Sequence, residues 1–247
     1  MLRIYLLERI ILERDGEVLL KDDAFRARQD RLLFAYFVLH RTRAVPREEL
    51  AAVLWPGVDD AGSDSSLKAL LSRLRSLLIP GTDLKLVSGG AQVQLLAPTD
   101  TWVDVEAAAY YADAAEVALR QGNDKAAFGP ASATSVLAAR AFLPGDRHPW
   151  VLKVRERLHR QRRALDCLAR VWLAGEEPVL AVEAASHALA LEPSRDTSCQ
   201  LLLEAHRAAG NPAAGVQAYH RFRTQLRESL GVDPAPETER VYLQLLA

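Results

Sequence analysis

The stretch SSLKALLSRLRSLL, Ser65–Leu78, decides the fold of the first part of the chain because its two faces differ. At about 100° per residue, its leucines form one core-facing stripe of a helix. The opposite face is small, and cations flank it. The small residues are Ser65, Ala69, Ser72 and Ser76, and the cations are Lys68, Arg73 and Arg75. This face suits a negatively charged groove, although a helix that is merely basic would show the same pattern.

The sequence around this helix has the order of a winged helix. Short apolar runs joined by an Asp15-Gly16 turn predict a small antiparallel sheet at the start of the chain. Two helices are expected next, near residues 32–39 and within VPREELAAVLWP, residues 45–56. After the quoted helix, LKLVSGGAQVQLL predicts a hairpin about Gly89-Gly90. Sheet, three helices and hairpin together predict a winged helix-turn-helix.

This order makes the quoted stretch the candidate DNA-reading helix, because the second helix of a helix-turn-helix lies in the major groove. Ser65 and Ser72 can then hydrogen-bond base edges or phosphates. Lys68, Arg73 and Arg75 can reach guanines or the DNA backbone, and their spacing does not decide which cation reads bases.

The cations of the first part of the chain are concentrated locally. Net charge is −1 for the whole chain, and residues 1–98 carry only +1. Between Arg26 and Arg47, however, six arginines accompany one acidic residue, Asp30. Such a patch suits phosphate binding, and Arg43 and Arg47 beside the second helix are candidates for backbone contacts.

The remainder of the chain is expected to be helical throughout, with one long helix over residues 149–175, and it contains a repeat. At an offset of 34 residues, one set of core positions matches another, as in a tetratricopeptide helix pair. The matched sets are Val182, Ala184, Ala185 and Ala188, and Val216, Ala218, Tyr219 and Phe222. Because such repeats bury their faces against neighbours, residues 99–247 are predicted to form one domain that folds alone. The fold class is therefore mainly α with a small antiparallel β part.

Several function classes find no support in the sequence. No apolar run approaches the roughly 20 residues of a membrane span, and the first residues do not resemble a signal peptide, so a cytoplasmic location is expected. The histidines have no metal-ligand spacing, and no G-x-S-x-G or G-x-x-x-x-G-K-[ST] motif occurs. Cys167 and Cys199 have no partner motif. We therefore expect no enzymatic activity, cofactor or metal.

Nearly the full chain resembles the Streptomyces antibiotic regulatory protein family. The resemblance rests on FRARQDRLLFAYFVLHRTRAVPREELAAVLWP, LLSRLRSLL, FLPGDRHPWV and ALALEPSRD, and most specifically on LGVDPAPET, residues 230–238. It implies a winged helix of the response-regulator type over residues 1–98 and a bacterial transcriptional activator domain, tetratricopeptide-like, over residues 99–247.

The resemblance also implies a function: activation of transcription by binding promoter direct repeats in double-stranded DNA, with self-association there, and by engaging RNA polymerase. By position, Ser72–Arg75 match the end of the family's recognition helix. The sequence departs from the family at the wing, where Lys85 is the sole cation, and at Gly129-Pro130, which is expected to interrupt a helix.

A second interpretation stays open. The weak net charge and the uncharged wing also fit a tetratricopeptide-like interaction scaffold whose winged helix no longer reads DNA. The sequence names neither the target promoter nor a small ligand for the helical groove.

Overall fold

The computed structural model describes residues 1–57, 63–78, 82–161 and 163–246. The chain divides into two compact units, each described here by itself. Unit 1 comprises Met1–Glu106 and Arg140–Arg155, and unit 2 comprises Ala107–Ala139 and Glu156–Ala247. These units place residues 140–155 with the N-terminal part of the chain, whereas the sequence suggested one division at residues 98 and 99. Independent folding of residues 99–247 stays a prediction.

Unit 1 begins with a four-stranded sheet in the order β3-β2-β1-β7. Its strands are β1 (Leu2–Tyr5), β2 (Ile11–Arg14), β3 (Glu17–Lys21) and β7 (Trp102–Val103). The first three strands are antiparallel, and β7 pairs parallel to β1. The β2–β3 hairpin turns at Asp15 and Gly16, both with positive φ, as the Asp-Gly pair predicted.

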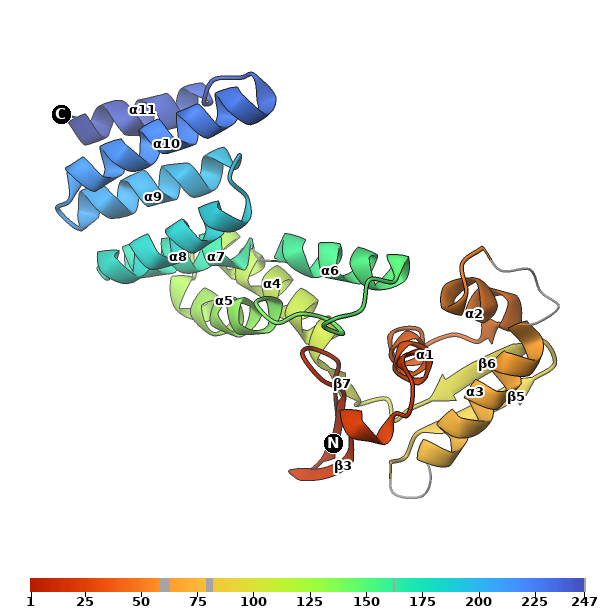
Figure 1. Cartoon of the computed structure of the whole chain (residues 1–247). Helices are drawn as coiled ribbons and strands as arrows, with labels where there is room; N and C mark the ends of the chain where they lie inside the picture. The colour runs from red at the N-terminus through yellow and green to blue at the C-terminus, as the bar shows by residue number, and fades with distance from the viewer. Residues whose placement is uncertain (58–62, 79–81, 162, 247) are drawn as a thin grey trace. The chain divides into compact units, whose positions relative to one another are not determined.

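The winged helix follows this sheet in the predicted order (Figure 1). Its elements are α1 (Arg28–Leu39), β4 (Val45–Pro46), α2 (Arg47–Leu54), α3 (Ser63–Leu77), β5 (Lys85–Gly89) and β6 (Gln92–Leu96). The wing hairpin β5–β6 pairs with β4 in a three-stranded sheet of order β4-β6-β5. Gly90 has positive φ at the hairpin turn, so glycine suits this position.

The core of the winged helix forms where the apolar face of α3 packs on α1. This face is the leucine stripe that the sequence predicted. Leu67, Leu70, Leu71 and Leu74 are buried, and so are Phe34 and Phe37 of α1. Because the leucine stripe must lie inward, the opposite face of α3 is presented to solvent.

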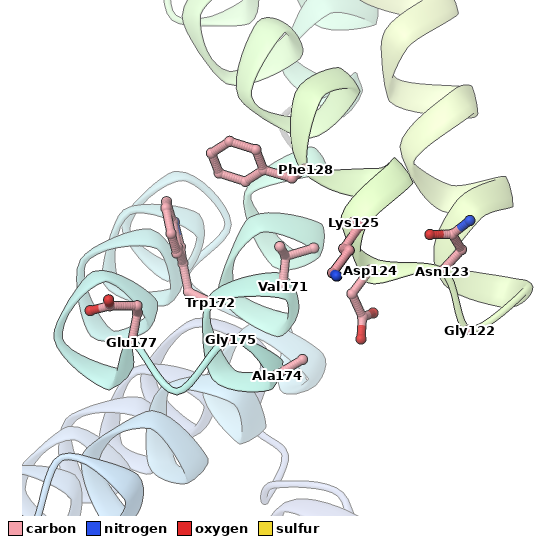
Figure 2. A pocket seen from close by; sticks show the side chains of 10 residues that line it. All are labelled: Gly122, Asn123, Asp124, Lys125, Phe128, Val171, Trp172, Ala174, Gly175 and Glu177. Atoms are coloured by element: carbon pink, nitrogen blue, oxygen red, sulfur yellow. The ribbon is translucent and has the colours of Figure 1, made fainter.

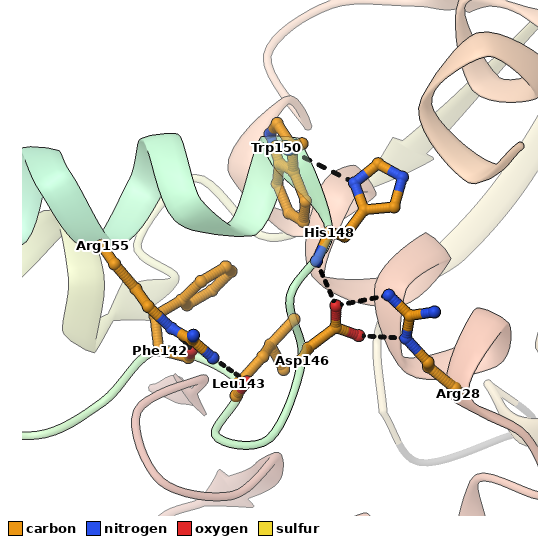
Figure 3. Close-up of polar contacts among 7 residues, drawn as sticks. All are labelled: Arg28, Phe142, Leu143, Asp146, His148, Trp150 and Arg155. Atoms are coloured by element: carbon orange, nitrogen blue, oxygen red, sulfur yellow. Dashed lines mark hydrogen bonds and ion pairs between the residues drawn. The ribbon is translucent and has the colours of Figure 1, made fainter. Parts of the chain in front are cut away.

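A segment distant in sequence, Arg140–Arg155, belongs to unit 1, and we call it the strap. Asp146 of the strap accepts two hydrogen bonds of 2.7 Å from Arg28 and one of 2.8 Å from the His148 N–H (Figure 3). Phe142 is fully buried and bridges to Leu7. Within the strap, Arg155 Nε donates to the Phe142 carbonyl at 2.8 Å, which joins its two ends.

Unit 2 is all-helical, and its last helices α8, α9, α10 and α11 lie side by side (Figure 1). Helices α4 (Asp104–Arg120) and α6 (Pro149–Gln161) begin in unit 1 and end in unit 2. The others are α5 (Asp124–Ala138), α7 (Ala164–Ala174), α8 (Pro178–Leu191), α9 (Asp196–Ala208), α10 (Pro212–Leu230) and α11 (Pro236–Leu246). The 34-residue repeat matches α8 to α10, and Ala185 and Tyr219 occupy equivalent buried positions.

Two sequence expectations about helices were wrong. Gly129 and Pro130 lie inside α5, which continues because Ala127, Ala131 and Thr134 are buried against neighbouring helices. The stretch expected as one long helix, residues 149–175, is two helices, α6 and α7, with Arg163 as the N-cap of α7. Residue 162, between them, lies outside the described part of the chain.

The family-like sequence at residues 230–238 fastens α11 to α9. Gly231 ends α10 in the left-handed conformation at φ 70°, and Pro236 begins α11. Asp196 of α9 accepts hydrogen bonds from the Ala235 N–H at 3.0 Å and from Thr238 Oγ1 at 2.5 Å. Thr238 is fully buried, so this motif closes the helical stack by polar contacts rather than by apolar packing alone.

Candidate nucleic-acid interface

The exposed face of α3 is the candidate reading surface. Ser65, Lys68, Ala69, Ser72 and Arg75 are all exposed. Small side chains at the centre of this face allow a groove floor to approach the helix closely, and the two long cations reach outward from its flanks. Four of the predicted site residues, Ser65, Lys68, Ser72 and Arg75, thus share one surface.

Lys68 stays accessible to a ligand although it is paired. Its Nζ lies 2.6 Å from Asp64 Oδ2, one helical turn earlier, and its side chain is 66% exposed. Ion pairs on such an exposed surface contribute at most about 1 kcal/mol, so a negatively charged ligand group can replace Asp64. Arg47 of α2 is more enclosed, with Nη1 4.0 Å from the same carboxylate.

Arg73 has a different environment from its neighbours on α3. Its Nε and Nη2 lie 3.1 and 3.0 Å from Oδ1 of Asp30, which is 1% exposed. Asp30 also accepts a hydrogen bond from the Ala27 N–H at the start of α1. Arg73 therefore fastens α3 to α1, and its guanidinium is directed to an internal carboxylate rather than to the small face of the helix.

Arg75 connects α3 to the wing. Its Nη2 donates to Oγ of Ser88, on strand β5. Sequence reasoning missed Ser88, because its separation of 13 positions from Arg75 matches no helical or strand period. The contact makes the wing strand and the exposed face of α3 one continuous surface.

Arg43 is held by an acid of the same unit. Its Nη1 donates to Glu49 Oε2 at 2.9 Å, and Nη2 bonds the other carboxylate oxygen, which also accepts from the Tyr36 hydroxyl. The hydrogen bond from Arg43, the largest effect, lowers the pKa of Glu49. Burial and the Glu49 contact raise the pKa of Tyr36 to about 12, so its hydroxyl remains a donor.

The expected arginine patch is largely neutralised within unit 1. Arg28, Arg31, Arg41, Arg43 and Arg47 each lie within 4.0 Å of a carboxylate. Of the six, Arg26 alone has no such partner among the residues that the structure describes. Sequence spacing did not show these pairs, because acids distant in sequence such as Asp146 and Glu106 reach the arginines in the folded chain. Phosphate binding by the patch stays a prediction.

Unit 2 contains a hollow of about 820 Å³ between the α4–α5 turn and the end of α7 (Figure 2). Phe128 and Trp172 meet edge to face beside it, with ring centroids 5.0 Å apart. Its charged residues are Asp124, Lys125 and Glu177, so both signs are present.

Neither a metal site nor a membrane segment is found in the described ranges. No three histidine, cysteine, aspartate or glutamate side chains there could hold a metal ion together. No helix in these ranges is long and apolar enough to cross a membrane. Burial raises the pKa of the Cys167 thiol to about 11, which keeps it protonated at neutral pH.

Comparison with known proteins gives matches over both parts of the chain. Residues 103–246 match the family model of the bacterial transcriptional activator domain. Over 234 residues, 94% of this chain, the sequence is 30% identical to the regulatory protein AfsR of Streptomyces coelicolor. The match covers 23% of AfsR, so the chain spans about a quarter of that relative's length.

A solved structure shares the fold. Mycobacterium tuberculosis EmbR, determined in complex with a low affinity phosphopeptide, superposes with a TM-score of 0.84 at 22% identity. The match covers 99% of this chain and 65% of EmbR. At this identity the likeness concerns the fold, and it confirms the winged helix followed by helical repeats.

Proposed function

Because this chain belongs to the bacterial transcriptional activator domain family, and to the Streptomyces antibiotic regulatory protein type within it, we propose that it is a sequence-specific DNA-binding activator of transcription. The observation that carries the proposal is the exposed face of α3, small at its centre and cationic at its flanks. Its burial pattern matches a helix inserted into the major groove.

Each of the seven predicted site residues has a proposed role. Lys68 and Arg75 contact base edges or phosphates, and Ser65 and Ser72 hydrogen-bond at close range. Arg73 acts as a positioning residue through Asp30. Arg43 and Arg47 remain candidates for backbone contacts, which for Arg43 would require exchange of Glu49 for a phosphate.

The finer part of the proposal concerns promoters. The chain binds direct repeats, two copies occupy adjacent sites, and unit 2 contacts RNA polymerase. What supports this is the family membership and the helical-repeat architecture, which offers extended surfaces to partners. Contact between two bound copies would raise the effective concentration of the second and so favour paired sites.

Selection of bound duplexes from a random DNA pool with the full chain tests the proposal. We expect an enriched sequence containing two similar half-sites in the same orientation. Mutation of one half-site should then also weaken binding to the half-site that is left unchanged, because the second bound copy no longer supports the first. Failure to enrich any sequence at low salt contradicts sequence-specific binding.

One observation favours the alternative, an interaction scaffold whose winged helix does not read DNA. Five of the six arginines in the expected patch are paired internally, and the wing carries Lys85 as its only cation. The variant Lys68→Ala/Arg75→Ala separates the two functions. If the chain is an activator, the unchanged chain binds DNA and the variant does not. If it is a scaffold, neither the unchanged chain nor the variant binds DNA, and both bind the protein partner.

A further inference from the structure

A second, smaller pocket in unit 2 is lined by arginines. It has a volume of about 250 Å³ and lies among α4, α7 and the start of α9. Four guanidinium groups line it, from Arg120 at the end of α4, Arg163 and Arg170 at and within α7, and Arg195 before α9. We call it the arginine pocket.

Two of these arginines are fixed by carboxylates. Arg163 Nη2 lies 2.7 Å from Asp113 Oδ1, and Arg163 also pairs with Glu116. Arg195 Nε lies 3.1 Å from Asp166 Oδ2, and its Nη1 lies 3.0 Å from Glu192 Oε2. Their geometry is set before any ligand arrives, which lowers the entropy cost of binding.

The other two arginines, Arg120 and Arg170, form no ion pair among the described residues. Arg120 and Arg170 are exposed, and neither has a carboxylate within ion-pair distance in the part of the chain that the structure describes. The lining contains four arginines and the two carboxylates of Glu116 and Asp166, and Asp113 and Glu192 pair with Arg163 and Arg195 from outside the lining. The buried Cys167 thiol, protonated at neutral pH, adds no negative charge.

The larger hollow beside Phe128 does not select a ligand in this way. Asp124, Lys125 and Glu177 give it both signs of charge, and its aromatic pair would accept many apolar groups (Figure 2). The arginine pocket, in contrast, places Arg120 and Arg170, which have no ion-pair partner among the described residues, beside two arginines that carboxylates hold in place.

We propose that the arginine pocket binds a small polyanion that carries two neighbouring negative groups, as in a diphosphate. Arg120 and Arg170 supply the guanidinium groups without an acid partner, and Arg195, whose Nε donates to the Thr197 hydroxyl at 3.0 Å, also lines the pocket. Guanidinium forks bind phosphate oxygens in a bidentate manner. A pocket of about 250 Å³ lies just below the range of drug-sized sites, so it suits a diphosphate group rather than a large ligand.

Calorimetric titration of the full chain with inorganic pyrophosphate, without DNA, tests the proposal. We expect saturable binding that weakens about tenfold or more for each guanidinium removed, in Arg120→Gln, Arg170→Gln and the double variant. Orthophosphate should bind more weakly, because it carries one phosphate group instead of two.

The matched control is Arg207→Gln/Arg221→Gln, which removes the same charge from two exposed arginines of unit 2 outside the pocket. It should bind pyrophosphate as the unchanged chain does. Equal loss in the control and in Arg120→Gln/Arg170→Gln would mean general surface attraction and would overturn the proposal. So would the absence of saturable binding in the unchanged chain. Tighter binding of an acidic peptide than of pyrophosphate would overturn the proposed ligand class, because the pocket would then bind peptides and not a diphosphate.

Discussion

Lys68 and Arg73 stand on the same helix, yet their acidic partners differ in burial. Asp30, the partner of Arg73, is 1% exposed, whereas Asp64, the partner of Lys68, is 58% exposed. A buried carboxylate that loses its cation keeps its desolvation cost, and an exposed carboxylate is solvated by water instead. The two cations therefore contribute differently to stability.

We predict that Arg73→Ala lowers the free energy of unfolding by about 1–3 kcal/mol, whereas Lys68→Ala changes it by less than about 0.5 kcal/mol. Urea denaturation measures both. Lys68→Ala should alter the base preference of the selected DNA site, and Arg73→Ala should weaken all sequences in proportion to the loss of folded protein. A double-mutant cycle with Asp30→Ala gives the coupling energy, and additive losses would contradict the Arg73–Asp30 link.

Asp104 provides a second prediction at single-residue scale. Its carboxylate accepts hydrogen bonds from the N–H groups of Leu6, Leu7 and Val105. Burial, the largest effect, raises its pKa from 3.8 to about 6 although these bonds oppose the shift. Between those values the folded chain holds a proton that the unfolded chain has released, so raising the pH through this window lowers the free energy of unfolding.

The variant Asp104→Asn removes that titration. The difference in unfolding free energy between the unchanged chain and the variant should therefore fall by about 2–3 kcal/mol as the pH rises from about 4 to 7. Denaturant titrations at both pH values measure it. A difference that grew with pH would show that the three hydrogen bonds outweigh burial.

At the scale of elements, periodicity predicted most of the helices and both hairpins. The leucine stripe of α3 and the Asp15-Gly16 and Gly89-Gly90 turns are local signals, and each appears where it was expected. The Gly129-Pro130 signal failed, because burial of Ala127 and Ala131 favours α5 more than proline disfavours it. Propensity yields to tertiary packing at such a site.

The candidate site was predictable only in part, because partners across the sequence leave no local trace. The helical wheel placed Arg73 beside the small face, but Asp30, 43 residues away, orients it elsewhere. Arg28 and Asp146 are 118 residues apart, and no spacing rule joins them. The sequence thus predicted which face of α3 is exposed, but it did not predict which cations of α3 are held by a buried carboxylate.

The strap gives a prediction about one element. Burial acts to raise the pKa of Asp146, but the hydrogen bonds from Arg28 and the His148 N–H outweigh it and lower the pKa below 3.8. The stabilisation from this carboxylate is therefore complete above its ordinary value and is lost as the pH falls through the lowered one. The substitution Asp146→Asn should lower the free energy of unfolding by about 1–3 kcal/mol at neutral pH.

Hydrogen exchange locates the effect of Asp146→Asn. Amides of residues 140–148 should exchange faster in the variant, while those of α9 and α10 should not change. The variant Asp124→Asn, whose residue lines the hollow of unit 2, is the control. Unchanged exchange in the strap would contradict a fastening role for Asp146.

At the scale of the whole molecule, the compact units refine the predicted division of the chain. A cut between residues 98 and 99 removes Asp104 and the strap from the sheet and helices they contact. We expect the fragment 1–98 to unfold at a lower urea concentration than unit 1 does within the full chain. The fragment 99–247 should keep α7 to α11 but show fast hydrogen exchange in residues 140–155. Protection of those residues in the fragment would contradict their assignment to unit 1.

The salt dependence of DNA binding follows from the charges of unit 1 as a whole. Phosphate contacts by all six arginines between Arg26 and Arg47 would give a log–log slope of about 5. Five of them are paired internally. The cations left for DNA are therefore chiefly Arg26, Arg75 and Lys85, which have no acid partner among the described residues, and Lys68, whose partner Asp64 is exposed. A slope of about 2–4 for each bound copy is therefore expected.

Fluorescence anisotropy of the full chain on one selected half-site, between about 50 and 200 mM KCl, measures this slope. Lys85→Gln, on the wing strand, should lower it by about 1 without changing base preference, as expected for a phosphate contact. Arg31→Gln is the matched control, because Arg31 pairs with Asp22 and should leave the slope unchanged. A slope of about 5 or more, or an equal decrease in Arg31→Gln, would mean that DNA displaces the internal acids and recruits the paired arginines. The paired arginines of the free chain would then exchange their carboxylate partners for DNA phosphates on binding. The DNA-binding surface would extend from α3 to α1.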